Sequence, residues 1–218
     1  DLESHVKDTL NAGGGLCHES AVRQTVNGGK RSIDWLVQQG VIFTENKQTD
    51  SNSPTQNEIN QYHLTKEGGH SHRRVVHADD ATGQAISGSL CQRAQEAENI
   101  DIFEQRVAID LITHKKLSLP GNRCVGAYVL NQLDNHVELF NARFVVIATG
   151  GASKAYLYTS NPDGASGDGI SMAWRGGCRV ANMEFNQFHP TCLYHPKAKS
   201  FLITEAVRGE GGRLLLPN

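Results

Sequence analysis

Polar residues in the last third of this 218-residue chain have types and spacings that could bind a substrate and move a proton. Gln187 and His189 are two positions apart, so on an extended segment their side chains point the same way. Glu205 and Arg208 are three apart, which places them on one face of a helical turn and lets them share a charge-assisted hydrogen bond. Inside a site such a pair can relay a proton. On a surface it is usually a solvated salt bridge, and a lone histidine is often a satisfied core residue, so these residues alone leave both interpretations open.

Two glycine-containing turns could approach a nucleotide. Residues 144–148 are an unbroken run of apolar, mostly β-forming residues, so we expect a strand buried on both faces that leads into Thr149, Gly150 and Gly151. Glycine lets the backbone approach a ligand closely, although many sheets end in Gly-Gly. Asp168 precedes a short expected helix, whose first N–H groups could hold an anion or a sugar-phosphate. A capping aspartate favours the same position for the same reason.

A second polar stretch, residues 62–74, contains closely spaced histidines. His70 and His72, with His77 nearby, would lie on one side of a strand. They lack a cluster of cysteines or carboxylates at the spacings that complete a tetrahedral zinc site, so we expect no metal. The chain also has no G-x-S-x-G sequence, which argues against a serine hydrolase of the α/β type.

Composition and charge exclude further classes. Lys and Arg number 21 against 23 Asp and Glu, for a formal net charge of -2, so neither nucleic acid nor an anionic membrane is an expected partner. No apolar run approaches the roughly 20 residues that a membrane-spanning helix needs, so no integral membrane contact is expected. The five cysteines are widely spaced without a C-x-x-C sequence, which indicates a reducing, cytoplasmic location with the cysteines as small buried hydrophobes.

Apolar periodicity predicts helices that alternate with β-type segments. The expected helices cover residues 1–11, a segment from about 19 to 26, 32–39 and 83–98; the expected β-type segments cover 100–113, 125–130, 137–140 and 144–148. Gly40 is the expected residue after the third helix. Residues 44–60 are polar and predict a surface loop. This alternation indicates an α/β fold with a partly parallel sheet.

Four blocks, in this order and spacing, resemble one flavoprotein family. They are Ala148-Thr149-Gly150-Gly151, Ser166-Gly167-Asp168-Gly169, Gln187-Phe188-His189-Pro190-Thr191 and Thr204-Glu205…Arg208-Gly209-Glu210-Gly211. The family comprises succinate dehydrogenase, fumarate reductase and L-aspartate oxidase. Within it, residues 63–74 and 77–79 resemble the aspartate oxidase branch. The resemblance covers nearly the whole chain and is weakest over 44–60.

The resemblance implies roles for individual residues. Asp168 corresponds to an aspartate that helps to hold FAD, and Val107 and Ala108 fall where backbone groups lie along its adenine half. The turn at Thr149, Gly150 and Gly151 belongs to the same cofactor site.

The remaining implied roles concern the substrate and the proton. His189 and Thr204, with Gln187 beside them, correspond to residues that grip a substrate carboxylate. Glu205 and Arg208 correspond to a path that carries a proton to a catalytic arginine expected beyond residue 218. Glu67 is specific to the branch, and its carboxylate could pair with a substrate ammonium group.

The implied activity is FAD-dependent oxidation of L-aspartate, or another C4 dicarboxylate, to iminoaspartate. Non-covalent FAD would accept a hydride, and O₂ or fumarate would reoxidise it. The product would feed quinolinate and NAD biosynthesis, with quinolinate synthase as an expected partner. The alternatives are a flavoprotein subunit of succinate dehydrogenase or fumarate reductase and a flavin-free binding module.

The chain departs from the family pattern at both ends. It lacks the opening strand with its G-x-G-x-x-G turn, which holds the FAD pyrophosphate at a helix N-terminus. We therefore expect an incomplete Rossmann-like FAD-binding domain over residues 1–184 and the start of a small α+β capping domain over 185–218. An internal segment of this kind is expected to bind FAD weakly and to be inactive alone.

Overall fold

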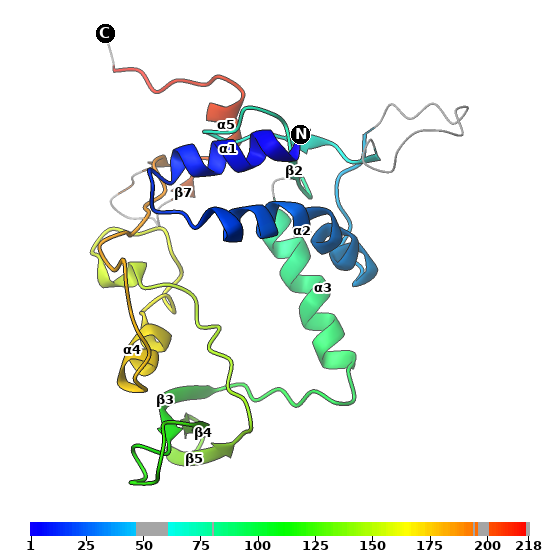
Figure 1. Cartoon of the computed structure of the whole chain (residues 1–218). Coiled ribbons are helices and arrows are strands. Elements are labelled where there is room, and N and C mark those ends of the chain that lie inside the picture. Colours follow the sequence, from blue (N-terminus) through cyan, green and yellow to red (C-terminus); the bar gives the residue numbers. More distant parts are fainter. Residues whose placement is uncertain (47–60, 80, 194, 196–200, 217–218) are drawn as a thin grey trace. The chain divides into compact units, whose positions relative to one another are not determined.

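The structure, a computed structural model, describes residues 1–46, 61–79, 81–193, 195 and 201–216 (Figure 1). Two compact units are present: Asp1–Asp101 together with Ile203–Asn218, and Ile102–Leu202. The predicted surface loop lies, apart from its first three residues, outside the described residues. The boundary between domains after residue 184 stays a prediction.

Two helices open the first unit and pack against each other (Figure 1). Helix α1 spans Leu2–Ala12 and begins where the Asp1 carboxylate accepts hydrogen bonds from the N–H groups of Glu3 and Ser4, at 3.1 and 3.4 Å. This is an N-cap, which satisfies N–H groups that have no partner inside the helix. The predicted first helix is confirmed.

Helix α2 corrects a sequence prediction, because it runs without interruption over Glu19–Gln38. The sequence pattern predicts two helices here, on either side of Gly28 and Gly29. Each glycine in a helix interior costs only about 1 kcal/mol, and packing against α1 outweighs that cost. The predicted end is confirmed. Gly40 has φ +95°, and hydrogen bonds from Gly40 N–H to Val37 and from Val41 N–H to Leu36 close a Schellman motif.

The remaining elements of the first unit are short strands and two helices. They are β1 (Leu64–Thr65), β2 (Val75–Val76), α3 (Thr82–Glu96) and α5 (Ala206–Gly209). Strands β1 and β2 pair antiparallel and close the base of the loop over residues 66–74. The core of this unit contains Val6, Val26, Val41 and Phe43.

A three-stranded antiparallel meander dominates the second unit (Figure 1). Its strands are β3 (Arg106–Thr113), β4 (Cys124–Asn131) and β5 (His136–Asn141). Helix α4 (Asp168–Arg175) packs on β3, and Met172 of the helix and Leu111 and Ile112 of the strand are buried. A 3₁₀ turn, η2 (Ser153–Ala155), and the strand pair β6 (Cys192–Leu193) and β7 (Phe201–Leu202) complete the unit.

Two details of the predicted fold are wrong. Every strand pair among the described residues is antiparallel, so no parallel sheet is seen there. Residues 144–148 form no strand, and Phe144 and Val146 are 85% and 87% exposed. An apolar run indicates that a segment is suited to a buried strand, but a strand also requires a neighbouring strand to pair with. None of the described strands pairs with residues 144–148.

The cysteine prediction is also wrong in part. All five cysteines are free thiols, but Cys91, Cys178 and Cys192 are exposed and only Cys17 and Cys124 are half-buried.

None of the helices that the structure describes is long and apolar enough to cross a membrane.

Gly126 makes the β4–β5 contact possible, because an added Cβ would overlap the Phe140 carbonyl group of β5. We expect Gly126→Ala to lower the free energy of unfolding by about 1–3 kcal/mol, as overpacking does. Gly88→Ala in α3 is the matched control: its Cβ would meet open space, and it should stabilise the helix by about 1 kcal/mol. Thermal unfolding of the two variants measures both effects, and equal melting temperatures would contradict the assignment.

Candidate active site

The glycine turn lies directly against the N-terminus of α4. Gly167 N–H donates to the carbonyl oxygen of Gly151 at 3.1 Å. An added Cβ at Gly169 would overlap the Thr149 hydroxyl, so the first turn of α4 touches that side chain. Asp168 is exposed in this turn and accepts a hydrogen bond from the Ser166 hydroxyl at 3.0 Å. The structure therefore brings the predicted cofactor-binding turn and Asp168 together.

The other two predicted cofactor residues, Val107 and Ala108, lie on β3 at the edge of the sheet. Strand β4 covers one side of β3, and no described strand covers the other. Alternate residues of an edge strand direct their backbone groups outward, so one of the two offers an N–H and a C=O to a ligand. Arg175, at the far end of α4, donates to the Ile109 carbonyl at 3.1 Å. Helix α4 thus joins the two parts of the predicted cofactor site over about 12 Å.

A buried amide lies beside the glycine turn. The hydroxyl of Ser153, which is 7% exposed, donates to Asn186 Oδ1 at 3.0 Å. Asn186 Nδ2 is buried and has no hydrogen-bond partner among the described residues. Open space adjoins Gly150 and Gly151, where an added Cβ would touch nothing. A buried donor needs an acceptor. The unpartnered amide and the open space at the turn therefore fit an elongated ligand with many acceptor atoms, such as FAD.

Gln187 and His189 follow Asn186 on a segment outside any helix or strand. Gln187 is exposed. The His189 ring is half-buried, and Nδ1 contacts the Thr191 carbonyl oxygen at 2.9 Å and the Thr191 N–H at 3.2 Å. Both contacts fall on Nδ1, which leaves Nε2 to meet a ligand. Phe188 packs edge-to-face against Tyr156, with ring centroids 5.0 Å apart and planes at 83°, and this contact ties the segment to the chain that follows the glycine turn.

In the first unit, α5 carries the other polar residues predicted for the site. Glu205 and Arg208 form an ion pair of 2.5 Å across one helical turn, which confirms the contact predicted from their spacing. Their side chains are 34% and 40% exposed. Thr204 precedes this turn, and its hydroxyl accepts from the Ala206 N–H at 3.4 Å. This local bond to the first residue of α5 is therefore one role of Thr204 that requires no ligand.

Glu67 lies next to this turn, although sequence spacing could not show it. Glu205 Oε1 is 3.1 Å from the position of an added Cβ at Gly68, and an added Cβ at Gly209 would overlap the Lys66 carbonyl oxygen. The loop over residues 66–74 therefore packs against α5. This contact joins Glu67, the predicted ammonium ligand, to Glu205 and Arg208, the predicted proton path.

Charge around this contact leaves one carboxylate available. Arg73 pairs with Glu210 at 2.6 Å, which lowers the pKa of the Glu210 carboxyl group, and Arg208 pairs with Glu205. Glu67 is exposed, and its carboxylate makes no hydrogen bond within the part of the chain that the structure describes. A free carboxylate beside two neutralised pairs favours a cationic ligand group.

The histidines pair with one another. His63 Nδ1 and His77 Nε2 are 2.7 Å apart, and His77 Nδ1 contacts the Asp79 carbonyl oxygen at 2.9 Å. Across the described residues no group of three or more His, Cys, Asp or Glu side chains could hold a metal ion.

The fold and these sites define a nucleotide-cofactor-binding domain of mixed helix and sheet structure. More narrowly, the chain belongs to the FAD binding domain family, whose sequence pattern matches residues 1–218.

Named relatives agree with this membership. L-aspartate oxidase of Pseudomonas aeruginosa is 63% identical over 217 residues, covering 100% of this chain and 40% of the relative. L-aspartate oxidase of Vibrio cholerae is 56% identical over 217 residues, covering 100% of this chain and 39% of the relative. Among solved structures, a variant of Escherichia coli quinol fumarate reductase superposes with a TM-score of 0.81 at 27% identity, covering 97% of this chain and 33% of the other. The chain thus spans about 40% of the length of the curated relatives that it matches.

Proposed function

We propose that the full-length protein that carries this sequence is an FAD-dependent oxidase that converts L-aspartate to iminoaspartate. The observation that carries the proposal is the free carboxylate of Glu67 beside the Glu205–Arg208 pair. Relatives named L-aspartate oxidase, up to 63% identical over the whole chain, support it.

The proposed substrate contacts divide the ligand between two sets of residues. His189 Nε2, the Thr204 hydroxyl and the Gln187 amide would hold a carboxylate, since each can donate a hydrogen bond. Glu67 would hold the ammonium group. Clamping both ends of a dicarboxylate fixes the direction of its Cα–H bond, and such orientation is a large part of catalysis.

Proton movement would use Glu205 and Arg208. Oxidation removes a hydride from Cα and a proton from the substrate nitrogen, as the C–H bond breaks and a C=N bond forms. The proton would leave through the Glu205–Arg208 pair, whose side chains reach solvent. FAD, when bound, would supply the two-electron acceptor for the hydride, and O₂ or fumarate would then take these electrons.

The residues proposed to hold FAD are Asp168, the turn at 149–151, and the outward backbone groups of Val107 or Ala108. We expect Asp168→Ala to weaken FAD binding about tenfold, because it removes a charged acceptor, and such hydrogen bonds contribute roughly 1.5–3 kcal/mol. Flavin fluorescence titration of the full-length apoprotein measures this affinity. Asp163→Ala, an exposed carboxylate in the preceding loop, is the control. Equal affinities of the two variants would place FAD elsewhere.

A second candidate function is that of a succinate dehydrogenase or fumarate reductase flavoprotein subunit, favoured by the fold similarity to fumarate reductase at a TM-score of 0.81. Assays of the full-length protein with L-aspartate and with succinate, under air and with fumarate as acceptor, separate the two. We expect turnover of L-aspartate. Turnover of succinate alone would favour the second candidate. Acid precipitation adds an independent test, because covalently attached flavin would stay in the pellet.

We further propose a cytoplasmic location and delivery of the product to quinolinate synthase for NAD biosynthesis. Iminoaspartate carries a hydrolysable C=N bond, so rapid use by a second enzyme would limit its loss in water. Co-purification of the two enzymes, and quinolinate yield in a coupled assay compared with separated enzymes, tests this partnership.

A further inference from the structure

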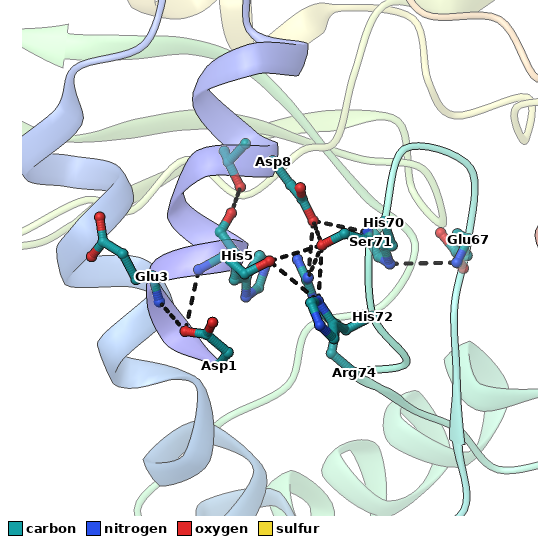
Figure 2. Close-up of polar contacts among 11 residues, drawn as sticks. Asp1, Glu3, His5, Asp8, Glu67, His70, Ser71, His72 and Arg74 are labelled. Atoms are coloured by element: carbon teal, nitrogen blue, oxygen red, sulfur yellow. Dashed lines mark hydrogen bonds and ion pairs between the residues drawn. The ribbon is translucent and has the colours of Figure 1, made fainter.

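A half-buried ion-pair network joins α1 to the loop that carries Glu67 (Figure 2). Asp8 Oδ2 accepts three hydrogen bonds: from Ser71 N–H at 2.9 Å, from the Ser71 hydroxyl at 2.7 Å and from Arg74 Nη2 at 2.9 Å. The side chains of Asp8 and Arg74 are only 19% and 13% exposed. Ser4, one helical turn earlier, adds a contact of 2.8 Å to the Ser71 hydroxyl. These bonds fix the middle of the loop to the helix.

The loop is held on two further sides. At its base, Arg74 N–H donates to the Thr65 carbonyl oxygen at 3.0 Å, next to the β1–β2 pair. At its other flank, Lys66 packs against Gly209 of α5. Asp8 therefore adds a third contact, and the turn that contains Glu67 is held between Asp8 and the other two.

Glu67 is linked to the network through His70. Glu67 N–H contacts His70 Nδ1 at 3.4 Å, and His70 N–H donates to the Glu67 carbonyl oxygen at 3.1 Å (Figure 2). The His70 ring packs edge-on against His5 of α1, with ring centroids 6.3 Å apart. Burial, then the charge of Arg74, lowers the pKa of His5, which favours the neutral form of this ring.

We propose that Asp8 is a positioning residue for Glu67: by binding Ser71 and Arg74, it holds the loop so that the Glu67 carboxylate meets the substrate ammonium group. This inference rests on the proposed function. Asp8, on α1, would then contribute to selectivity for an amino acid over a dicarboxylate without an ammonium group, although Asp8 need not touch the substrate.

The charge state of Asp8 suits this role. Hydrogen bonds from the Ser71 N–H and hydroxyl groups, and then from Arg74, lower the pKa of the Asp8 carboxyl group to about 2. Because the folded-state pKa is lowered, the stabilisation is present above the ordinary pKa near 4 and is lost only as the pH falls towards 2. Asp8 therefore stays charged, and the loop contact is kept, at and above its ordinary pKa of 3.8.

The test uses Asp8→Ala in the full-length protein, with Asp8→Asn as the shape-conserving variant. We expect KM for L-aspartate to rise about 10- to 100-fold in Asp8→Ala, since a small displacement of a substrate-binding group has effects of this size. Asp8→Asn, which keeps an acceptor oxygen, should show a smaller rise. The inhibition constant of succinate, which has no ammonium group, should stay within about twofold. Simple destabilisation would instead reduce the number of active molecules. It would lower kcat without changing the ratio of KM for L-aspartate to the inhibition constant of succinate.

Two comparisons make the test specific. Glu3→Gln on the same helix removes a carboxylate that pairs with Arg23 at 2.8 Å, away from the loop, and should leave both constants unchanged. In a Glu67→Gln background, Asp8→Ala should raise KM little further, because both changes remove the same contact. Full additivity of the two changes would overturn the proposal.

Hydrogen exchange gives a readout that does not depend on activity. Amides of residues 66–72 should exchange at least about tenfold faster in Asp8→Ala than in wild type or Glu3→Gln. Unchanged exchange would overturn the proposal whatever the substrate proves to be. If exchange rises but wild type does not oxidise L-aspartate, the proposed function fails, and the assignment of Asp8 to substrate selectivity fails with it.

Discussion

Replacing Glu67 with glutamine in the full-length protein is expected to raise KM for L-aspartate about 10- to 100-fold while FAD stays bound. Glutamine keeps the size and one acceptor oxygen but removes the charge. A hydrogen bond to a charged group contributes roughly 1.5–3 kcal/mol, and about 1.4 kcal/mol corresponds to a tenfold change in binding. Steady-state kinetics with L-aspartate, together with the flavin absorbance of the purified variant, measure the two outcomes.

The specificity of this effect is tested with a ligand that lacks the ammonium group. Succinate should inhibit wild type and Glu67→Gln equally, because its carboxylates would meet other residues. Glu98→Gln, an exposed carboxylate just beyond α3, controls for the loss of a negative charge. If Glu67→Gln left KM for L-aspartate unchanged, or weakened succinate by the same factor, Glu67 would not be the ammonium ligand.

Local sequence signals predicted those elements whose ends are set by local chemistry. Gly40 closes α2 with a positive φ, as expected from residue type. Signals failed where packing decides. Gly28 and Gly29 suggested a break, yet the contact of α2 with α1 keeps the helix continuous. Phe144 and Val146 suggested a buried strand, but residue type cannot report whether a partner strand is present.

The candidate site shows the same division between local and distant information. The spacing of Glu205 and Arg208 predicted their ion pair, since both lie on one helical turn. The sequence does not predict the Asp8 network, because a carboxylate on the polar side of an amphipathic helix is usually solvated. No sequence spacing relates Asp8 to Ser71 and Arg74, and only the fold of the loop against α1 reveals the contact.

Breaking the Glu205–Arg208 pair is expected to lower kcat more than any other single change. Glu205→Gln and Arg208→Gln each interrupt the proposed route for the substrate proton, and positioned acid–base groups contribute typically about 10²–10⁴-fold to rate. KM for L-aspartate should change little, because neither residue is proposed to grip the substrate. Steady-state kinetics across pH, compared with wild type, measure the loss and show whether the variants shift the pH dependence of kcat.

Because Glu205 and Arg208 lie on one proposed proton path, their substitutions should not add. The double variant Glu205→Gln/Arg208→Gln should be about as slow as either single variant, since groups that act as a unit are strongly non-additive. Asp34→Asn is the matched control, because it breaks an exposed ion pair of the same kind, with Lys30 at 2.9 Å on α2. Such surface pairs contribute roughly 0–1 kcal/mol to stability and nothing to turnover. If the Glu205 and Arg208 variants kept kcat within about twofold of Asp34→Asn, the pair would be a solvated salt bridge, and the proton would have to leave the substrate by another route.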